Sequence, residues 1–234
     1  MMDKRNFDYL DKNLAEIREK MNNAEKSSKF DISPVMIAAV KYADGEEIKY
    51  LTENAGVTDI GENRVQQLLE HLEFIDTEKV NLHFIGSLQT NKVKYIIDKV
   101  CLIHSLDSLK LAAEIDKQAK KHGIIMDVLV EINSGREENK SGILPEDVKQ
   151  FCLELQKFAS INLRGFMTMA PKCENKSNYF KYFEETCKLV LDIWRILSHN
   201  NSEMILSMGM SESFEEAILS GATHVRIGRS IFKK

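Results

Sequence analysis

The stretch that decides the fold is Val35-Met36-Ile37-Ala38-Ala39-Val40-Lys41, six apolar residues followed by a lysine. A strand with one solvent-exposed face alternates apolar and polar residues. A continuous apolar run is instead typical of a strand covered on both sides in a parallel sheet. Further short apolar runs follow it, and most of them are also continuous. The full set spans residues 35–40, 57–60, 82–85, 100–103, 126–132, 161–166, 204–206 and 223–227.

Helical patterns with charges on one side separate these runs. They span residues 46–54, 64–74, 92–99, 108–122, 146–159, 179–198 and 213–219. Strand and helix alternating to a count of about eight predict an α/β fold of the (β/α)₈ TIM-barrel type, for which 234 residues is a typical length. An open doubly wound sheet is the competing architecture. Closure is favoured because it brings Lys41 and Arg226, near opposite ends of the sequence, to one rim.

An amphipathic helix is predicted ahead of the first strand, over residues 7–24. Leu10, Leu14, Ile17 and Met21 lie three or four residues apart and form one apolar stripe. We expect residues 1–30 to form a helical extension packed across one end of the barrel. Residues 1–234 as a whole are predicted to form a single domain.

Composition narrows the range of partners. The net charge of −4 argues against nucleic acid, because proteins that bind it usually present a dense basic face. No run is long and apolar enough to span a membrane, and the charged N-terminus does not resemble a secretory signal. The four cysteines lack metal-ligand spacing, which is typical of reduced thiols. We expect a cytoplasmic monomer with a small-molecule ligand.

Three motifs carry candidate chemistry, and each follows an expected strand. Barrel active sites lie at the carboxyl ends of the strands, where the last two loops often bind phosphate. Lys41 ends the first strand; it could simply extend to solvent, or desolvation there could favour the neutral amine that imine formation needs. Residues 207–211, beginning with Ser207, form a Gly/Ser turn suited to phosphate. Gly228 permits close backbone approach, and Arg229 could add charge there or be an exposed arginine.

In an extended strand Arg226 and His224 point to the same face of the sheet, and Val225 and Ile227 point to the opposite face. It could pair with a carboxylate of a neighbouring helix, or point inward, where a buried guanidinium needs an acceptor such as a pyridine nitrogen. An amine together with two phosphate-type turns suggests a phosphorylated aldehyde held as a Schiff base, and pyridoxal phosphate is the obvious candidate. An arginine at the ring nitrogen weakens this cofactor as an electron sink.

Other polar residues favour simpler roles. Glu62 is expected to stabilise a helix N-terminus, while Asn63 could reach a ligand from the rim. His83 and His104 lie inside apolar runs, which favours hydrogen-bonded core residues over ligands. No metal-binding pattern emerges.

Seven stretches resemble the pyridoxal-phosphate homeostasis protein family, single-domain relatives of the alanine racemase N-terminal barrel. They are AAVKY, IGENRVQQ, LHFIGSLQTNKVK, EINSGREENKSGI, LRGFMTMAP, LSMGMSESFEEAI and THVRIGRSIF, in the order of the family and over about residues 35–232. The resemblance implies a barrel with pyridoxal 5'-phosphate on Lys41 and its ring nitrogen facing Arg226. It also implies phosphate held around Ser207, Gly228 and Arg229, with Asn63 and Met167 near the cofactor.

The resemblance also bears on activity. Alanine racemase uses a second acid/base, a tyrosine from a separate β domain, and these 234 residues leave no range for such a domain. We therefore expect a carrier or regulator of cofactor supply, with apo-enzymes that depend on pyridoxal phosphate as candidate partners, and not an efficient enzyme. The alternatives are a barrel enzyme with true turnover, as a weak amino-acid racemase or a Schiff-base aldolase, and a sensor that forms no covalent link.

Overall fold

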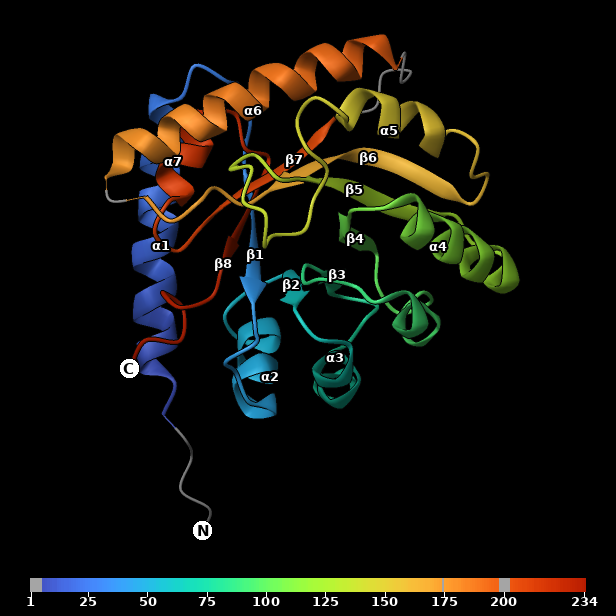
Figure 1. The fold of residues 1–234 in the computed structure, drawn as a ribbon. Helices are drawn as coiled ribbons and strands as arrows, with labels where there is room; N and C mark the ends of the chain where they lie inside the picture. Colours follow the sequence, from blue (N-terminus) through green and yellow to red (C-terminus); the bar gives the residue numbers. More distant parts are fainter. Residues whose placement is uncertain (1–5, 174, 198–202) are drawn as a thin grey trace.

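The computed structural model describes residues 6–173, 175–197 and 203–234 and is a closed barrel of parallel strands (Figure 1). The strands follow one another around the barrel in sequence order. They are β1 (Val35–Ala39), β2 (Asp59–Glu62), β3 (Asn81–Phe84), β4 (Leu102–Leu106), β5 (Met126–Ile132), β6 (Ile161–Thr168), β7 (Ile205–Met210) and β8 (His224–Ile227). The barrel prediction is confirmed and the open sheet is wrong, because β8 pairs with β1, with Arg226 opposite Ile37.

Helices follow most of the strands and cover the barrel. They are α1 (Asp8–Ser27), α2 (Gly45–Glu53), α3 (Val65–His71), η1 (Leu72–Phe74), η2 (Thr90–Tyr95), α4 (Leu109–His122), α5 (Val148–Leu155), α6 (Lys176–Ile196) and α7 (Phe214–Leu219). The helix expected over residues 92–99 is instead the short 3₁₀ helix η2. Ser198, the expected end of the helix that became α6, lies outside the described residues.

Three strands differ from the prediction in a way that matters for the site. β2 and β4 each begin two residues later than expected, and β7 continues to Met210. The later strand residues include Glu62, His104 and Ser207, which are polar and so do not extend an apolar run. Ser207 therefore lies inside a strand and not in a turn.

α1 takes a place in the ring of helices beside the barrel, and the expectation that it lies across one end is wrong. It packs against α7 on one side, and on the other Tyr50 of α2 donates a hydrogen bond to Asp11 (Oη to Oδ2, 2.7 Å). Asn13 donates to the carbonyls of Ile231 (2.9 Å) and Lys233 (2.8 Å), which lie beyond β8. Figure 1 shows the C-terminus beside α1. The N-terminal helix thus covers the junction between the last strand and the first.

The buried residues form two shells. The larger one lies between the strands and the helices and includes Ala38, Ile60 and Phe166, residues that point outward from the barrel. The second lies in the lumen and contains an apolar group of Leu102, Leu129 and Met167. The remaining lumen residues include several polar side chains, and these form the candidate site.

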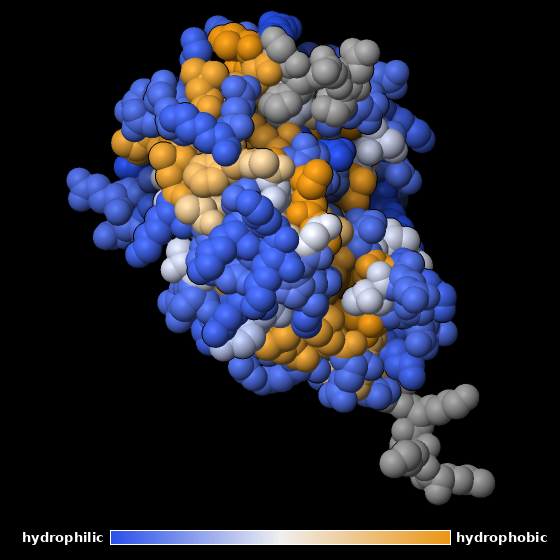
Figure 2. Space-filling model, turned by 90° about the vertical axis from the view of Figure 1, so that its right-hand side faces the viewer, coloured by the Kyte–Doolittle hydropathy of each residue, from blue (hydrophilic) through white to orange (hydrophobic). Residues whose placement is uncertain are grey.

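Figure 2 shows a predominantly hydrophilic face interrupted by separate hydrophobic areas. Within residues 6–173, 175–197 and 203–234, no helix is long and apolar enough to cross a membrane.

Candidate functional site

Lys41 lies in the turn after β1, at the carboxyl end of the barrel. Its side chain is exposed, with Nζ 4.8 Å from the centroid of the Tyr42 ring. Its main-chain carbonyl accepts a hydrogen bond from Gln67 Nε2 (3.1 Å), which ties this turn to α3. The expectation of a desolvated lysine at the strand end is wrong, because β1 stops at Ala39 and Lys41 lies two residues further along. The rim therefore carries a solvent-accessible amine.

Arg226 points into the lumen, as its strand parity predicted, and is only 5% exposed. Nη1 donates a hydrogen bond to Ser207 Oγ (2.5 Å) and Nη2 donates to the carbonyl of Thr168 (2.9 Å). Burial lowers the pKa of the guanidinium to about 10, and Glu131 acts in the opposite direction. The alternative of a helix carboxylate is wrong, because both partners found among the described residues are neutral groups on strands. A buried cation with neutral partners can still accept a further ligand.

Glu131 of β5 brings a carboxylate to the same buried region. It is 3% exposed, and Oε1 accepts a hydrogen bond from Ser141 Oγ (2.9 Å). Burial raises the pKa of this carboxyl group, and the hydrogen bond from Ser141 opposes that effect. Asp107 raises the pKa further and Arg226 lowers it. The region of the lumen near Arg226 thus contains one acidic group that holds a proton more readily than usual.

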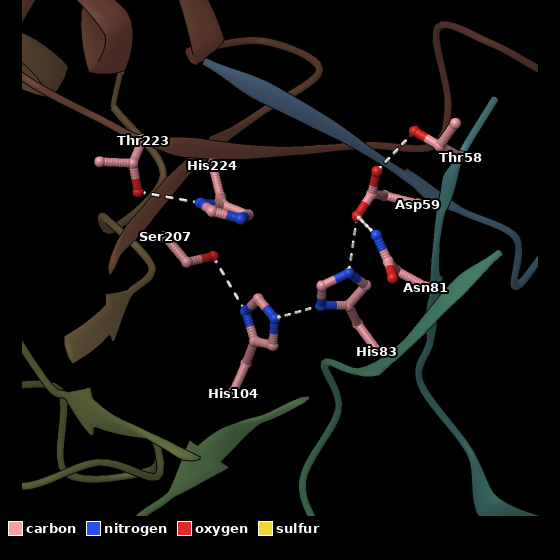
Figure 3. Close-up of polar contacts among 8 residues, drawn as sticks. All are labelled: Thr58, Asp59, Asn81, His83, His104, Ser207, Thr223 and His224. Carbon is pink, nitrogen blue, oxygen red and sulfur yellow. Dashed lines mark hydrogen bonds and ion pairs between the residues drawn. The ribbon is translucent and has the colours of Figure 1, made fainter. Parts of the chain in front are cut away.

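Ser207, which accepts a hydrogen bond from Arg226, is also one end of a buried series of hydrogen-bonded polar side chains. Figure 3 shows this series from Ser207 to Asp59. His104 Nδ1 lies 3.0 Å from Ser207 Oγ, and His104 Nε2 lies 3.1 Å from His83 Nδ1. His83 Nε2 lies 3.0 Å from Asp59 Oδ1. The prediction that both histidines are hydrogen-bonded core residues is confirmed. Their link to Arg226 gives them a place in the site that the sequence did not reveal.

Asp59 anchors the far end of this chain, at the start of β2. Thr58 Oγ1 (2.7 Å) and Asn81 Nδ2 (3.1 Å) donate to its carboxylate in addition to His83. Burial raises the pKa of Asp59, but the hydrogen bonds from these three residues outweigh that effect and keep the pKa below its usual value. Asp59 is therefore an ionised acceptor at neutral pH.

The ends of β7 and β8 form the rim where phosphate was expected. The backbone N–H groups of Gly228 and Ser230 both point to Ser211 Oγ, at 3.4 and 3.3 Å. These contacts are long, so the two donors can still bind an anion. Arg229 is exposed and forms an ion pair with Glu212 (2.9 Å). Ser211 is thus the hydroxyl at the rim.

The expected role of the Ser207 side chain as a phosphate ligand needs a correction. Its side chain is completely buried, and its hydroxyl contacts Arg226 and His104 in the lumen. A hydroxyl with these two partners supports the arginine and does not reach the rim. The hydroxyl that lies at the end of β8 is instead that of Ser211.

Asn63 lies on the same rim as Lys41 and lines a pocket of about 500 Å³ with it. Its Oδ1 atom is buried and has no hydrogen-bond partner among the described residues, which leaves it able to bind a ligand donor. The backbone here is tightly packed, since a Cβ on Gly86 would lie 2.1 Å from the carbonyl oxygen of Asn63. The pocket therefore has a fixed edge.

Glu62 does not stabilise the start of α3, so that expectation is wrong. It is the last residue of β2 and is completely buried, and its Oε1 atom lies 2.6 Å from His71 Nδ1 on α3. Burial raises the pKa of the carboxyl group, against the hydrogen bond from His71. Glu62 thus joins β2 to α3 outside the lumen.

The predicted residues fall into three groups. Arg226, Ser207 and Met167 are buried in the lumen. Lys41 and Asn63 line one side of the rim, and Gly228 and Arg229 lie at the end of β8. Sequence reasoning included Ser211 only as the end of the 207–211 turn, and it missed Glu131 and the contacts of His83 and His104. Only the histidines carried a signal, because two imidazoles inside apolar runs of a parallel sheet must find polar partners in the lumen.

A closed (β/α)₈ barrel with a lysine after its first strand and a buried arginine on its eighth defines a TIM-type protein with a polar site at the C-terminal face. Residues 6–234 match the family described as alanine racemase, N-terminal domain. The pyridoxal phosphate homeostasis protein of Aquifex aeolicus is 40% identical over 94% of this chain and 95% of its own length. That of Helicobacter pylori is 35% identical, over 85% of this chain and 87% of its own.

A solved structure agrees with these sequence relatives. PipY of Synechococcus elongatus, with pyridoxal phosphate bound, superposes with a TM-score of 0.81 at 25% identity, covering 95% of this chain and 99% of PipY. The chain therefore belongs to the pyridoxal phosphate homeostasis protein family, as its sequence motifs predicted.

Proposed function

We propose that this protein binds pyridoxal 5'-phosphate as a Schiff base on Lys41 and holds and transfers the cofactor in homeostasis, without being an efficient enzyme. The observation that carries the proposal is Arg226, a buried guanidinium whose partners are a hydroxyl and a carbonyl. Such a cation is suited to an uncharged ring nitrogen acceptor. The relatives support the same ligand, since PipY was solved with pyridoxal phosphate bound.

The residues present fit the three functional groups of this cofactor. The amine of Lys41 forms a C=N bond to the aldehyde carbon, and the aldehyde oxygen leaves as water. The N–H groups of Gly228 and Ser230, which share the single oxygen of Ser211, are available for phosphate. When bound, the cofactor supplies an electron sink for carbanions. Arg226 weakens that sink because its charge keeps a proton off the ring nitrogen.

The covalent link can be tested by trapping. The protein is incubated with pyridoxal phosphate, reduced with borohydride and digested, and the modified peptide is found by mass spectrometry. We expect the adduct on Lys41 and its loss in Lys41→Ala, while Lys49→Ala, which removes an exposed lysine of α2, changes nothing. A label found only on another lysine, or none at all, contradicts the proposal.

The carrier role needs a separate test. Loaded protein should restore activity to an apo-enzyme that depends on pyridoxal phosphate, in a coupled assay with equal free cofactor as the control. Alanine should be racemised very slowly, because no group other than Lys41 is assigned to move a proton, and a positioned second acid or base contributes about a hundred- to ten-thousand-fold in rate. Rapid turnover of an amino acid or a sugar phosphate that Lys41→Ala abolishes would favour an enzyme.

A further inference from the structure

The proposed binding of the cofactor assigns no role to the buried series of hydrogen-bonded side chains that runs from Asp59 to Ser207. Its members make no contact with the rim, and burying polar groups costs free energy unless each one is hydrogen-bonded. Here every link is present, at 3.0 Å, 3.1 Å and 3.0 Å from Asp59 through His83 and His104 to Ser207. The chain ends on Arg226, the residue that defines the site. These side chains can therefore act on the site through Arg226.

The direction of the hydrogen bonds follows from the two ends of the chain. Asp59 is ionised and can only accept, so His83 Nε2 carries a hydrogen. Burial lowers the pKa of His104 well below 6.5, and the charge of Arg226 adds to this, so His104 is neutral. At the other end Arg226 can only donate, so Ser207 Oγ accepts from it.

One arrangement of hydrogens satisfies every group between these ends. Ser207 donates to His104 Nδ1, His104 Nε2 donates to His83 Nδ1, and His83 Nε2 donates to Asp59. In the opposite direction His104 would donate to Ser207, whose own hydrogen would then have no acceptor among the described residues. An unpaired buried hydroxyl is costly, so the first arrangement prevails.

This direction has a consequence for Arg226. With its hydrogen committed to His104, Ser207 offers only lone pairs to the guanidinium, and the carbonyl of Thr168 offers the second acceptor. Two acceptors on neighbouring strands fix the plane of the guanidinium. Without His104 the Ser207 hydroxyl can rotate and lose this orientation.

We propose that His104, held by His83 and Asp59, is a positioning residue that orients Arg226 toward the cofactor ring through Ser207. The inference rests on the proposed function, because the oriented guanidinium serves a bound ring nitrogen. It assigns a role to residues that touch neither the cofactor nor the rim. It also explains why this barrel keeps the linked imidazoles of His83 and His104 in its lumen, where apolar side chains would pack without hydrogen-bonding requirements.

The first test uses the cofactor-free protein. Long-range ¹H–¹⁵N correlation spectra of the histidine rings report which nitrogen carries the hydrogen. We expect a neutral His104 with its hydrogen on Nε2 and a His83 with its hydrogen on Nε2. A hydrogen on His104 Nδ1, or a charged His104 at neutral pH, overturns the inference.

The second test compares variants by absorption titration with pyridoxal phosphate. His104→Leu should weaken binding about tenfold, the effect of roughly one hydrogen bond. It should also make the absorption band of the bound cofactor change with pH between 6 and 8, because Arg226 no longer excludes a proton from the ring nitrogen. His104→Asn, whose amide oxygen can replace Nδ1 as the acceptor for Ser207, should recover part of both properties. His122→Leu, on the exposed end of α4, is the matched control and should behave as wild type.

The outcomes separate the two proposals. The positioning role alone is overturned if the wild type binds the cofactor and folded His104→Leu has the same affinity and spectrum. It is also overturned if His104→Leu loses stability but its spectrum does not change. Failure of the wild type to bind pyridoxal phosphate overturns the proposed function and this inference with it. If His104→Leu does not fold, Ser207→Ala gives the same comparison. The ring spectra of the wild type then decide the direction of the hydrogen bonds between Ser207 and Asp59.

Discussion

Ser207 and Arg226, on neighbouring strands β7 and β8, are joined in the lumen by a hydrogen bond of 2.5 Å from Nη1 to Oγ. The pairing of β7 with β8 brings their side chains together, although one residue was expected at the phosphate and the other at the ring nitrogen. Their contact makes the hydroxyl part of the arginine's support. We therefore expect phosphate binding, as proposed above, to depend on the backbone beyond both strands.

Replacing Ser207 by alanine should destabilise the protein. The change leaves one Arg226 N–H and the Nδ1 atom of His104 without partners in a buried place. We expect the free energy of unfolding to fall by about 1–3 kcal/mol, measured by urea denaturation of the cofactor-free protein. Ser230→Ala, at the partly exposed rim, is the control and should cost far less. Equal losses in both variants would show that the lumen contact adds nothing.

Gly228→Ala should weaken pyridoxal phosphate binding more than Arg229→Ala does. A Cβ on Gly228 would lie 2.9 Å from the carbonyl oxygen of Ala39 and 3.3 Å from its Cβ, so the backbone that presents the rim N–H groups must shift. Arg229 is exposed and already paired with Glu212. Titration with the cofactor, and competition by inorganic phosphate, measure the effect. The reverse order would make Arg229 the principal phosphate ligand.

Arg226→Met should separate stability from binding. A buried cation without a carboxylate partner in hydrogen-bonding contact is costly to fold, and an apolar side chain of similar length removes that cost. We expect the unfolding free energy to stay within about 1 kcal/mol of wild type or to rise, while cofactor affinity falls at least tenfold. Calorimetry and absorption titration on the same samples test both halves. Undiminished affinity would remove Arg226 from the site.

Stability should fall as the pH drops below about 6.5. Unfolded histidine titrates near that value, whereas burial lowers the pKa of His224 to about 4 and that of His104 well below 6.5. Between these pKa values the unfolded chain binds protons that the folded chain does not, so acid favours unfolding. Glu62 and Glu131, whose pKa burial raises, oppose this trend at lower pH.

The size of this pH effect can be measured on one residue. From pH 7 to pH 5, His224 alone should account for a loss of about 2 kcal/mol in the free energy of unfolding. His224→Gln cannot titrate and should show a smaller loss over the same interval in urea denaturation. His122→Gln, on the surface, should keep the wild-type dependence. If the unfolding free energy of His224→Gln depends on pH as strongly as that of the wild type, the effect cannot be assigned to His224.

The sequence predicted the barrel because continuous apolar runs are what a strand covered on both faces requires, as at residues 35–40. It also predicted the inward direction of Arg226, because strand parity is fixed by geometry. It misplaced Ser207 because a strand that turns small polar residues toward the lumen loses its apolar signature. The path from Asp59 to Ser207 could not be predicted, since it depends on the registers of four strands and no local pattern encodes them.

Closure of the barrel by β8 against β1, with α1 over the junction, has a consequence for synthesis in the cell. A chain leaves the ribosome from its N-terminus, so β1 and α1 emerge long before the strand that completes them. Until β8 appears, one edge of β1 presents unpaired backbone groups that can recruit other chains. This edge of β1 therefore stays open until β8 has been released, and the hydrogen bonds from Asn13 to the segment after β8 can form only then.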